Sequence, residues 1–179
     1  MTRSYRFTFS DESTARFHAP RGWEVSLCYD LDRAAHDDLT AKRSAIAAIS
    51  ADLKRLGVKR RPLEDGGAYY VEGDEESPFV SEATFKLGEY ARALEDLGRV
   101  AFALDLAKAA VHIRRLDAES VEWPTLTRGS GVADVEDRLD VLYEYPHPDL
   151  ERLVADYRKL SREGLSSLTD RERDDLKKS

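Results

Sequence analysis

The chain has little of what marks a secreted or membrane protein. Cysteine occurs once in 179 residues, at Cys28. One cysteine can form no intrachain disulfide and no cysteine-rich zinc site, which favours a reducing, cytoplasmic compartment. No run of about 18 apolar residues occurs, so we expect no membrane span. The first residues alternate apolar and polar side chains, so we expect no secretory signal peptide.

Other absences limit the chemistry that the chain can perform. The histidines at 18, 36, 112 and 147 are scattered and give no metal-ligand spacing. The G-x-G at 129–131 follows no strand of the buried type, so a dinucleotide site is not expected there. No internal repeat and no low-complexity tract interrupts the sequence. We therefore expect no cofactor.

Charge is abundant but unevenly placed. The net charge is -7, yet residues 1–62 carry 12 Lys and Arg against 8 Asp and Glu, and residues 63–179 carry 16 against 27. A basic first third followed by an acidic remainder hints at charged partners. The overall negative sign argues against a dedicated duplex-binding protein, which is usually basic throughout.

Alternation of apolar and polar residues predicts strands in the first part of the chain. Residues 4–10, 15–19 and 23–29 each alternate, and the clearest pattern is Trp23, Val25, Leu27 and Tyr29 against the polar residues between them. Short turns join the three segments, which predicts an antiparallel meander with an aromatic face. We expect that face to form core, although an aromatic sheet face can also stack single-stranded bases.

Helical periodicity dominates the rest. Apolar residues recur at three- and four-residue spacing over 38–56, 78–116, 132–142 and 149–163, and residues 58–63 and 68–72 predict a hairpin around Asp65-Gly66. Gly98 could split the second helix. The predicted order of strand 23–29, helix, hairpin and helix resembles a split βαβ unit. The expected fold is α+β, with a small, mostly antiparallel N-terminal sheet packed on several helices and an all-helical C-terminal half.

We expect a single domain over residues 1–163, with the sheet in 4–72 and the helical part in 78–163. Residues 164–179 form a polar tail with too few apolar side chains to offset the entropy of ordering it. We expect the tail to be mobile in the isolated monomer and to order, if at all, against another chain.

A basic cluster is the first candidate site. It comprises Lys54, Arg55, Lys59, Arg60 and Arg61. Such a patch can meet phosphates or an acidic partner. Its residues also have structural uses, because cations complement a helix C-terminus and protect the edge of a sheet from aggregation.

An acidic pair is the second candidate. Asp30 and Asp32 follow the predicted strand 23–29, and two carboxylates at a strand end can hold a divalent cation such as Mg²⁺. Carboxylates before a helix are also favourable without any metal.

Asp105, Lys108, His112 and Arg115 lie on one helical face, where a surface stripe of salt bridges is favoured over an acid/base site.

No catalytic constellation stands out, which favours a protein that is not an enzyme while leaving the question open. The sequence predicts an interaction or regulatory protein that acts through helical surfaces on a protein partner or on a second copy. The alternatives are a nucleic-acid-associated protein that uses the basic cluster and a metal-dependent phosphoryl-transfer enzyme at Asp30 and Asp32.

Overall fold

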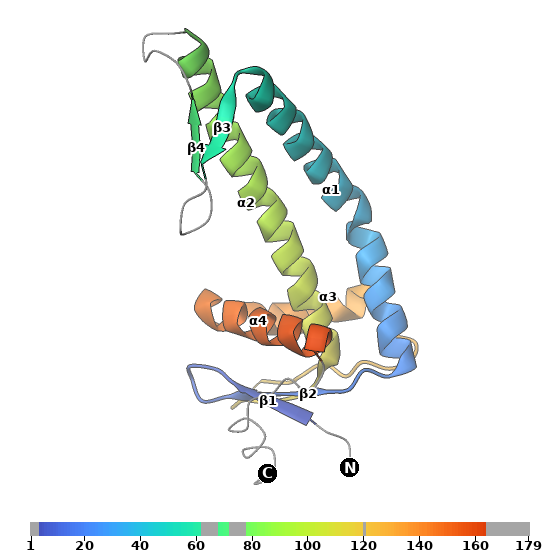
Figure 1. The fold of residues 1–179 in the computed structure, drawn as a ribbon. Coiled ribbons are helices and arrows are strands. Elements are labelled where there is room, and N and C mark those ends of the chain that lie inside the picture. Colours follow the sequence, from blue (N-terminus) through green and yellow to red (C-terminus); the bar gives the residue numbers. More distant parts are fainter. Residues whose placement is uncertain (1–3, 62–67, 72–77, 120, 164–179) are drawn as a thin grey trace. The chain divides into compact units, whose positions relative to one another are not determined.

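The computed structural model describes residues 4–61, 68–71, 78–119 and 121–163. The predicted Asp65-Gly66 turn and the predicted mobile tail therefore lie outside the described residues. The α+β class is confirmed: a small antiparallel sheet in the N-terminal part accompanies long helices, and the C-terminal part is helical. The elements in Figure 1 are β1 (Ser4–Thr8), β2 (Thr14–His18), α1 (Gly22–Arg55), β3 (Val58–Arg61), β4 (Ala68–Val71), α2 (Pro78–His112), β5 (Ile113–Asp117), α3 (Val132–Tyr143) and α4 (His147–Glu163).

The main sheet has the strand order β1-β2-β5, with both pairings antiparallel. Arg16 pairs with Arg115 but Phe17 pairs with Ile113, so Arg114 is an extra residue in β5. Such a bulge bends its strand and redirects the neighbouring side chains.

The predicted strand over 23–29 is wrong, because these residues form the start of α1. Period 2 and period 3.6 coincide at Trp23 and Leu27, four residues apart, and this made the alternation misleading. In the helix Leu27 and Leu31 are buried, whereas Tyr29 stays 67% exposed. The helix begins where the Glu24 carboxylate accepts a hydrogen bond from the Arg21 backbone N–H at 2.6 Å, one half of a capping box.

The third strand of the sheet was also missed. Residues 113–117, predicted as the end of the second helix, form β5, so the expected split βαβ order does not occur. The Ile113 carbonyl accepts hydrogen bonds from Trp123 Nε1 and Arg138 Nη1, two side chains that follow later in the sequence. The predicted hairpin does form, as β3 and β4, but in a separate two-stranded sheet. Gly98 does not split α2.

The described chain divides into two compact units, and each is treated by itself. Unit 1 takes the residues up to Ala35 and those from Phe102 on, and unit 2 takes His36–Ala101. The division falls inside both α1 and α2. The expectation of a single domain stays a prediction.

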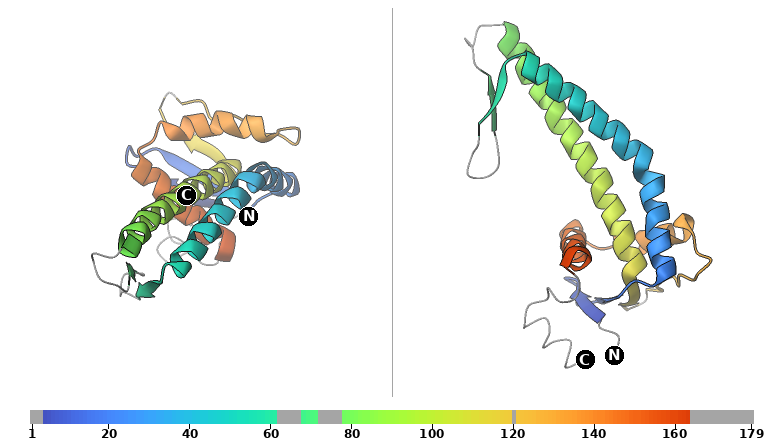
Figure 2. Two further views of the ribbon diagram at one scale, coloured as in Figure 1. Left: turned by 90° about the horizontal axis from the view of Figure 1, so that it is seen from above. Right: turned by 45° about the vertical axis from the view of Figure 1, so that its right-hand side comes forward.

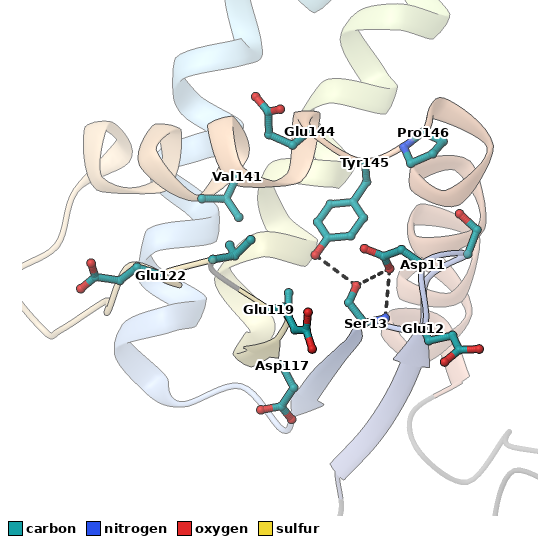
Figure 3. Close-up of a pocket in the computed structure, with 13 residues that line it drawn as sticks. Asp11, Glu12, Ser13, Asp117, Glu119, Glu122, Val141, Glu144, Tyr145 and Pro146 are labelled. Carbon is teal, nitrogen blue, oxygen red and sulfur yellow. Dashed lines mark hydrogen bonds between the residues drawn. The ribbon is translucent and has the colours of Figure 1, made fainter.

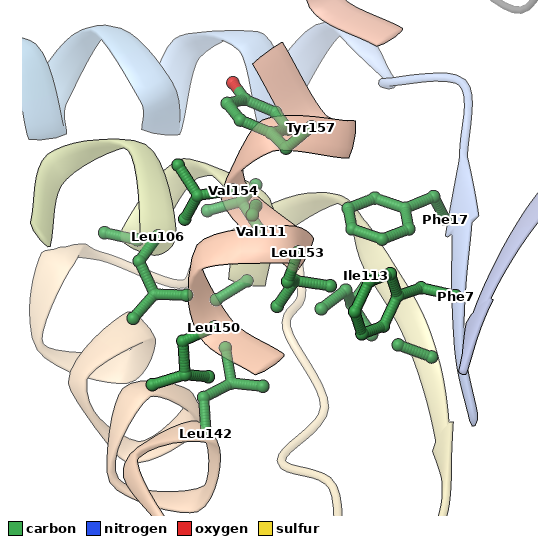
Figure 4. Packing of buried hydrophobic residues seen from close by; sticks show 14 of the residues in the cluster. Phe7, Phe17, Leu106, Val111, Ile113, Leu142, Leu150, Leu153, Val154 and Tyr157 are labelled. Atoms are coloured by element: carbon green, nitrogen blue, oxygen red, sulfur yellow. The ribbon is translucent and has the colours of Figure 1, made fainter. Parts of the chain in front are cut away.

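Unit 1 holds the hydrophobic core. Figure 4 shows Leu153, Val154 and Tyr157 of α4 packed among side chains of the sheet, of α3 and of the last turns of α2. The predicted aromatic core is confirmed for Tyr5, Phe7 and Phe17 of the sheet and for Phe9, which follows β1; all four are buried. The sheet face is thus covered and leaves no aromatic platform for stacking bases.

Unit 2 is a helical hairpin with a thin core. Its stretches of α1 and α2 run antiparallel and side by side in Figure 1 and Figure 2. Among the described residues of this unit, the buried hydrophobic side chains are Leu53 and Ala83. Lys86 of α2 bridges to Asp52 of α1 at 3.8 Å. Across both units, no described helix combines the length and the apolar character needed to span a bilayer.

Candidate functional site: an acidic groove in unit 1

An open groove of about 840 Å³ lies between three segments of unit 1. Its walls are the turn between β1 and β2, the segment that follows β5, and the junction of α3 and α4 (Figure 3). The side chains that line it are Ser10, Asp11, Glu12, Ser13, Asp117, Ala118, Glu119, Val121, Glu122, Val141, Glu144, Tyr145 and Pro146.

Hydrogen bonds within the β1–β2 turn hold one wall in place. Phe9 N–H donates to the Ser13 carbonyl at 2.9 Å, and Ser13 N–H donates to Asp11 Oδ1 at 3.0 Å. Glu12 adopts a positive φ of 70°, a left-handed conformation that is unusual for glutamate. The turn therefore presents Glu12 on a defined backbone.

A hydroxyl chain ties this turn to the opposite wall. Ser13 Oγ lies 2.7 Å from Asp11 Oδ1 and 3.1 Å from the Tyr145 hydroxyl, as drawn in Figure 3. The Tyr145 ring stacks on Phe9 with a centroid distance of 4.0 Å. Burial raises the pKa of Tyr145, so the phenol stays protonated at neutral pH. Ser13 and Tyr145 thus connect the β1–β2 turn to the α3–α4 junction through neutral hydroxyl groups.

The charge of the groove is of one sign. Its lining includes six carboxylates and no Lys, Arg or His. Asp117 is compensated from outside the groove by Arg115 and by Arg16, the latter at 3.3 Å. The glutamates make no ion pair among the described residues; they are Glu12, Glu119, Glu122 and Glu144.

Uncompensated carboxylates around a groove attract cations. Val121, Val141 and Pro146 add apolar surface that can accommodate the methylene stems of Lys or Arg. No group of three His, Cys, Asp or Glu residues suited to a metal ion occurs in the described part of the chain. The groove is therefore suited to a cationic side chain or segment.

A second set of reactive groups lies inside unit 1. Cys28 Sγ of α1 is 3.7 Å from His112 Nε2 of α2, and the His112 ring meets Tyr157 edge to face. Burial raises the pKa of Cys28 to about 11 and lowers that of His112. Both groups are then neutral at pH 7, whereas a nucleophilic cysteine needs its thiolate. The pair is suited to packing rather than to nucleophilic attack.

The predicted surface stripe on α2 takes a different form. Among the described residues, its members on α2 pair with other helices, and Arg115 pairs with Asp117 within β5. Asp105 accepts a hydrogen bond from Arg158 of α4 at 2.7 Å, and Lys108 donates to Asp32 of α1 at 2.5 Å. Three- and four-residue spacing placed Asp105, Lys108 and His112 on one helical face, but the prediction was wrong for Arg115, which lies in β5. It could not reveal that α1 and α4 bring partners to that face.

The two predicted metal ligands, Asp30 and Asp32, do not face the same site. Asp30 and Asp32 are two positions apart on a helix, which places them on opposite sides of α1. Asp30 lies 3.7 Å from Arg33, and Asp32 pairs with Lys108. The metal-site hypothesis stays a prediction that these contacts do not support.

The basic cluster is divided between the last turn of α1 and β3. Lys54 and Arg55 lie exposed in the last turn, where Arg55 bridges to Asp52, and Gly57 turns the chain with a φ of 76°. The remaining members lie on β3, where Lys59, Arg60 and Arg61 are in register with Tyr70, Tyr69 and Ala68. Binding of phosphates or of an acidic partner by the basic cluster stays a prediction.

Sequence reasoning missed the acidic groove. Its carboxylates come from residues 11–12, 117–122 and 144, which no periodicity connects. The only signal was the acidic composition of residues 63–179, which gives the sign of the charge but not its location. No family model, no curated protein and no solved structure matches this chain.

Proposed function

We propose that the protein is a non-catalytic interaction protein that binds a Lys- and Arg-rich segment of a partner protein in the acidic groove of unit 1. The observation that carries this proposal is the groove itself, an open cavity with six acidic side chains and no basic one in its lining. The interaction class is the one expected from the sequence. The groove replaces an unspecified helical surface with a particular one.

The shape of the groove supports a peptide segment over a single small cation. The carboxylates come from three separate segments, the β1–β2 turn, residues 117–122 and the α3–α4 junction. Carboxylates spread along an open groove can meet several cationic side chains of one chain in succession. Rim charges contribute mainly to the association rate and to partner choice, so the interaction should be sensitive to salt.

The test is binding of a fluorescent Lys/Arg-rich peptide to the full chain at low and at physiological salt. The Glu119→Gln, Glu122→Gln double variant should weaken binding about fivefold, as two exposed charge interactions of about 0.5 kcal/mol each imply. The matched control is Glu136→Gln, Asp137→Asn, which removes two exposed charges of α3 outside the groove. Equal weakening in both double variants would mean that net charge alone attracts the peptide.

Carbodiimide coupling in a cell extract supplies a second test, because it joins carboxylates directly to partner lysines. Cross-links should map to Glu119, Glu122 or Glu144. Cross-links spread evenly over the acidic surface would contradict the proposal.

A second candidate function is binding of single-stranded nucleic acid by the β3–β4 hairpin. The register that sets Lys59 against Tyr70 and Arg60 against Tyr69 favours it, because cations and aromatic rings together bind such strands. Neutralising Lys59, Arg60 and Arg61 should reduce affinity for a single-stranded oligonucleotide and flatten its salt dependence. An unchanged salt slope would remove this candidate.

A further inference from the structure

Unit 1 contains a second pocket of opposite character, with a volume of about 300 Å³. It lies at the start of α1 and along β5, with residues 123–126 and Arg138 of α3 completing the wall. Its cationic side chains are Arg21, Arg114, Arg115 and Arg138, and its only carboxylate is Glu24.

Two of these arginines are available to a ligand. Arg21 and Arg114 are exposed, and neither guanidinium makes an ion pair within the described part of the chain. Arg115 is compensated by Asp117. Arg114 is the extra residue of the β5 bulge, and bulges commonly redirect a side chain toward a site.

The carboxylate of Glu24 offsets only one of these four positive charges. Its two oxygens lie 3.0 and 3.1 Å from His18 Nε2, and Oε2 also accepts the Arg21 backbone N–H. The side chain is only 5% exposed. Glu24 is therefore occupied by its own partners. Burial lowers the pKa of Arg138 only to about 10, so its guanidinium remains charged at neutral pH.

His18 supplies an independent observation that points to a ligand site. Its side chain lines the pocket and is 7% exposed, and Nδ1 has no hydrogen-bond partner among the described residues. Buried polar atoms are almost always paired, and an unpaired one is a reason to look for a bound group. With Nε2 on Glu24, Nδ1 is free to meet a polar atom of a ligand.

Aromatic surface accompanies the charge. Trp23 and Trp123 both line the pocket, together with Leu126. The Arg138 guanidinium lies over the Trp123 ring at 4.7 Å, which fixes the indole in place. Flat apolar walls beside unpaired guanidinium groups are suited to a ligand that has a planar ring and an anionic group.

We propose that this pocket binds a small organic phosphate that carries a planar ring, with the phosphate at Arg21 and Arg114 and the ring against the tryptophan side of the pocket. This inference is independent of the acidic groove, since the two cavities share no lining residue. Either proposal can fail without the other.

The chain's two tryptophans both line this pocket, so intrinsic fluorescence reports on it directly. We would titrate the full chain with adenosine monophosphate, adenosine and inorganic phosphate, exciting at the red edge of the indole absorption, where adenine does not absorb. Adenosine monophosphate should change the emission with a Kd below about 1 mM and bind more tightly than the other two probes.

Arg21→Gln, Arg114→Gln should weaken that binding about tenfold or more, the loss expected for charge-assisted hydrogen bonds. Arg128→Gln, an exposed arginine outside the pocket, should leave it unchanged. Circular dichroism of each variant checks the fold. Nitrogen NMR of His18 should show Nδ1 shifting when the ligand is added.

Four outcomes would overturn the proposal. They are no response to millimolar adenosine monophosphate, an equal response to adenosine, an equal response to inorganic phosphate, and an affinity that the double arginine variant leaves unchanged.

Discussion

Asp149 is a buried carboxylate that its hydrogen bonds hold in the charged form. It lies in the first turn of α4 and is 3% exposed. Ser10 donates to Asp149 Oδ2 through its hydroxyl at 2.5 Å and its backbone N–H at 3.0 Å, and Arg152 donates to Oδ1. These hydrogen bonds, led by the Ser10 hydroxyl, lower the pKa of Asp149.

Replacing Asp149 by Asn should therefore cost about 2–3 kcal/mol of unfolding free energy at pH 7. The folded pKa lies below the unfolded value of about 3.9, so the stabilisation is complete above the unfolded pKa and is lost as pH falls through the folded pKa. Denaturant unfolding of wild type and variant from pH 7 to pH 3 should show the difference shrink below about pH 4. Asp137→Asn is the exposed control. A difference that stays constant down to pH 3 would contradict this account.

The Cys28 thiol is expected to react slowly with alkylating reagents. With its pKa raised to about 11, the thiolate fraction near neutral pH is about 100-fold smaller than for the model thiol with a pKa of 9.0. Alkylation by iodoacetamide should accordingly be about 100-fold slower in the folded chain than in denaturant. The chain has one thiol, so the readout is unambiguous. A folded rate equal to the unfolded one would mean that His112 activates the sulfur.

At this scale, the sequence predicted residue chemistry but not residue partners. The shared face of Asp105, Lys108 and His112 follows from helical spacing. Their partners Arg158, Asp32 and Cys28 lie on α4 and α1, at sequence separations that no local pattern reaches. No local pattern predicts that His18 and Arg114 line the second pocket of unit 1 together, because the β2–β5 pairing brings them there.

Among the elements, α3 is bonded to its neighbours through one buried cation. Arg138 donates to the carbonyls of Ala110 in the last turn of α2, of Ile113 at the start of β5 and of Pro124, at 2.7 to 2.8 Å. Each of these carbonyls would lose a charged donor if the guanidinium were removed. Cations at a helix C-terminus also stabilise its dipole.

Arg138→Met should cost about 3–5 kcal/mol, since it leaves buried carbonyls without a partner. Arg138→Lys should recover little of this, because a single ammonium cannot reproduce the planar set of donors. Thermal unfolding of both variants, with exposed Arg128→Met as control, measures the effect. Full rescue by lysine would show that charge alone is needed.

The element boundaries show where sequence periodicity stops being informative. Period 3.6 located four helices, and period 2 located β1 and β2. The segment 23–29 satisfied both periods over its short length, and the capping carboxylate of Glu24 decides between them. The end of α2 could not be predicted, because the groups that take the Ile113 carbonyl come from Trp123 and Arg138.

For the whole molecule, stability should differ between the two units. Unit 1 contains every member of the large hydrophobic cluster, whereas unit 2 buries only Leu53 and Ala83 among its described apolar residues. Amide hydrogens in the α1 and α2 stretches of unit 2 should therefore exchange faster than those of residues 106–111.

Leu53→Ala should cost about 2–5 kcal/mol within unit 2 and raise exchange over residues 36–55, while leaving residues 106–111 protected. Leu106 is a fully buried leucine of unit 1. Leu106→Ala should raise exchange over residues 106–111. Hydrogen exchange read by mass spectrometry compares the two variants. Equal effects of each variant on both units would mean that the chain unfolds as one.

The order in which the two units can fold during synthesis follows from the division inside α1 and α2. Unit 1 is discontinuous: its first segment ends at Ala35 and its second begins at Phe102. During synthesis, the first segment must wait for all of unit 2 to be translated before its core partners exist. Unit 2 is continuous in sequence and can form its hairpin earlier. An early hairpin shortens the effective loop that unit 1 must close and so lowers the entropic barrier to its assembly.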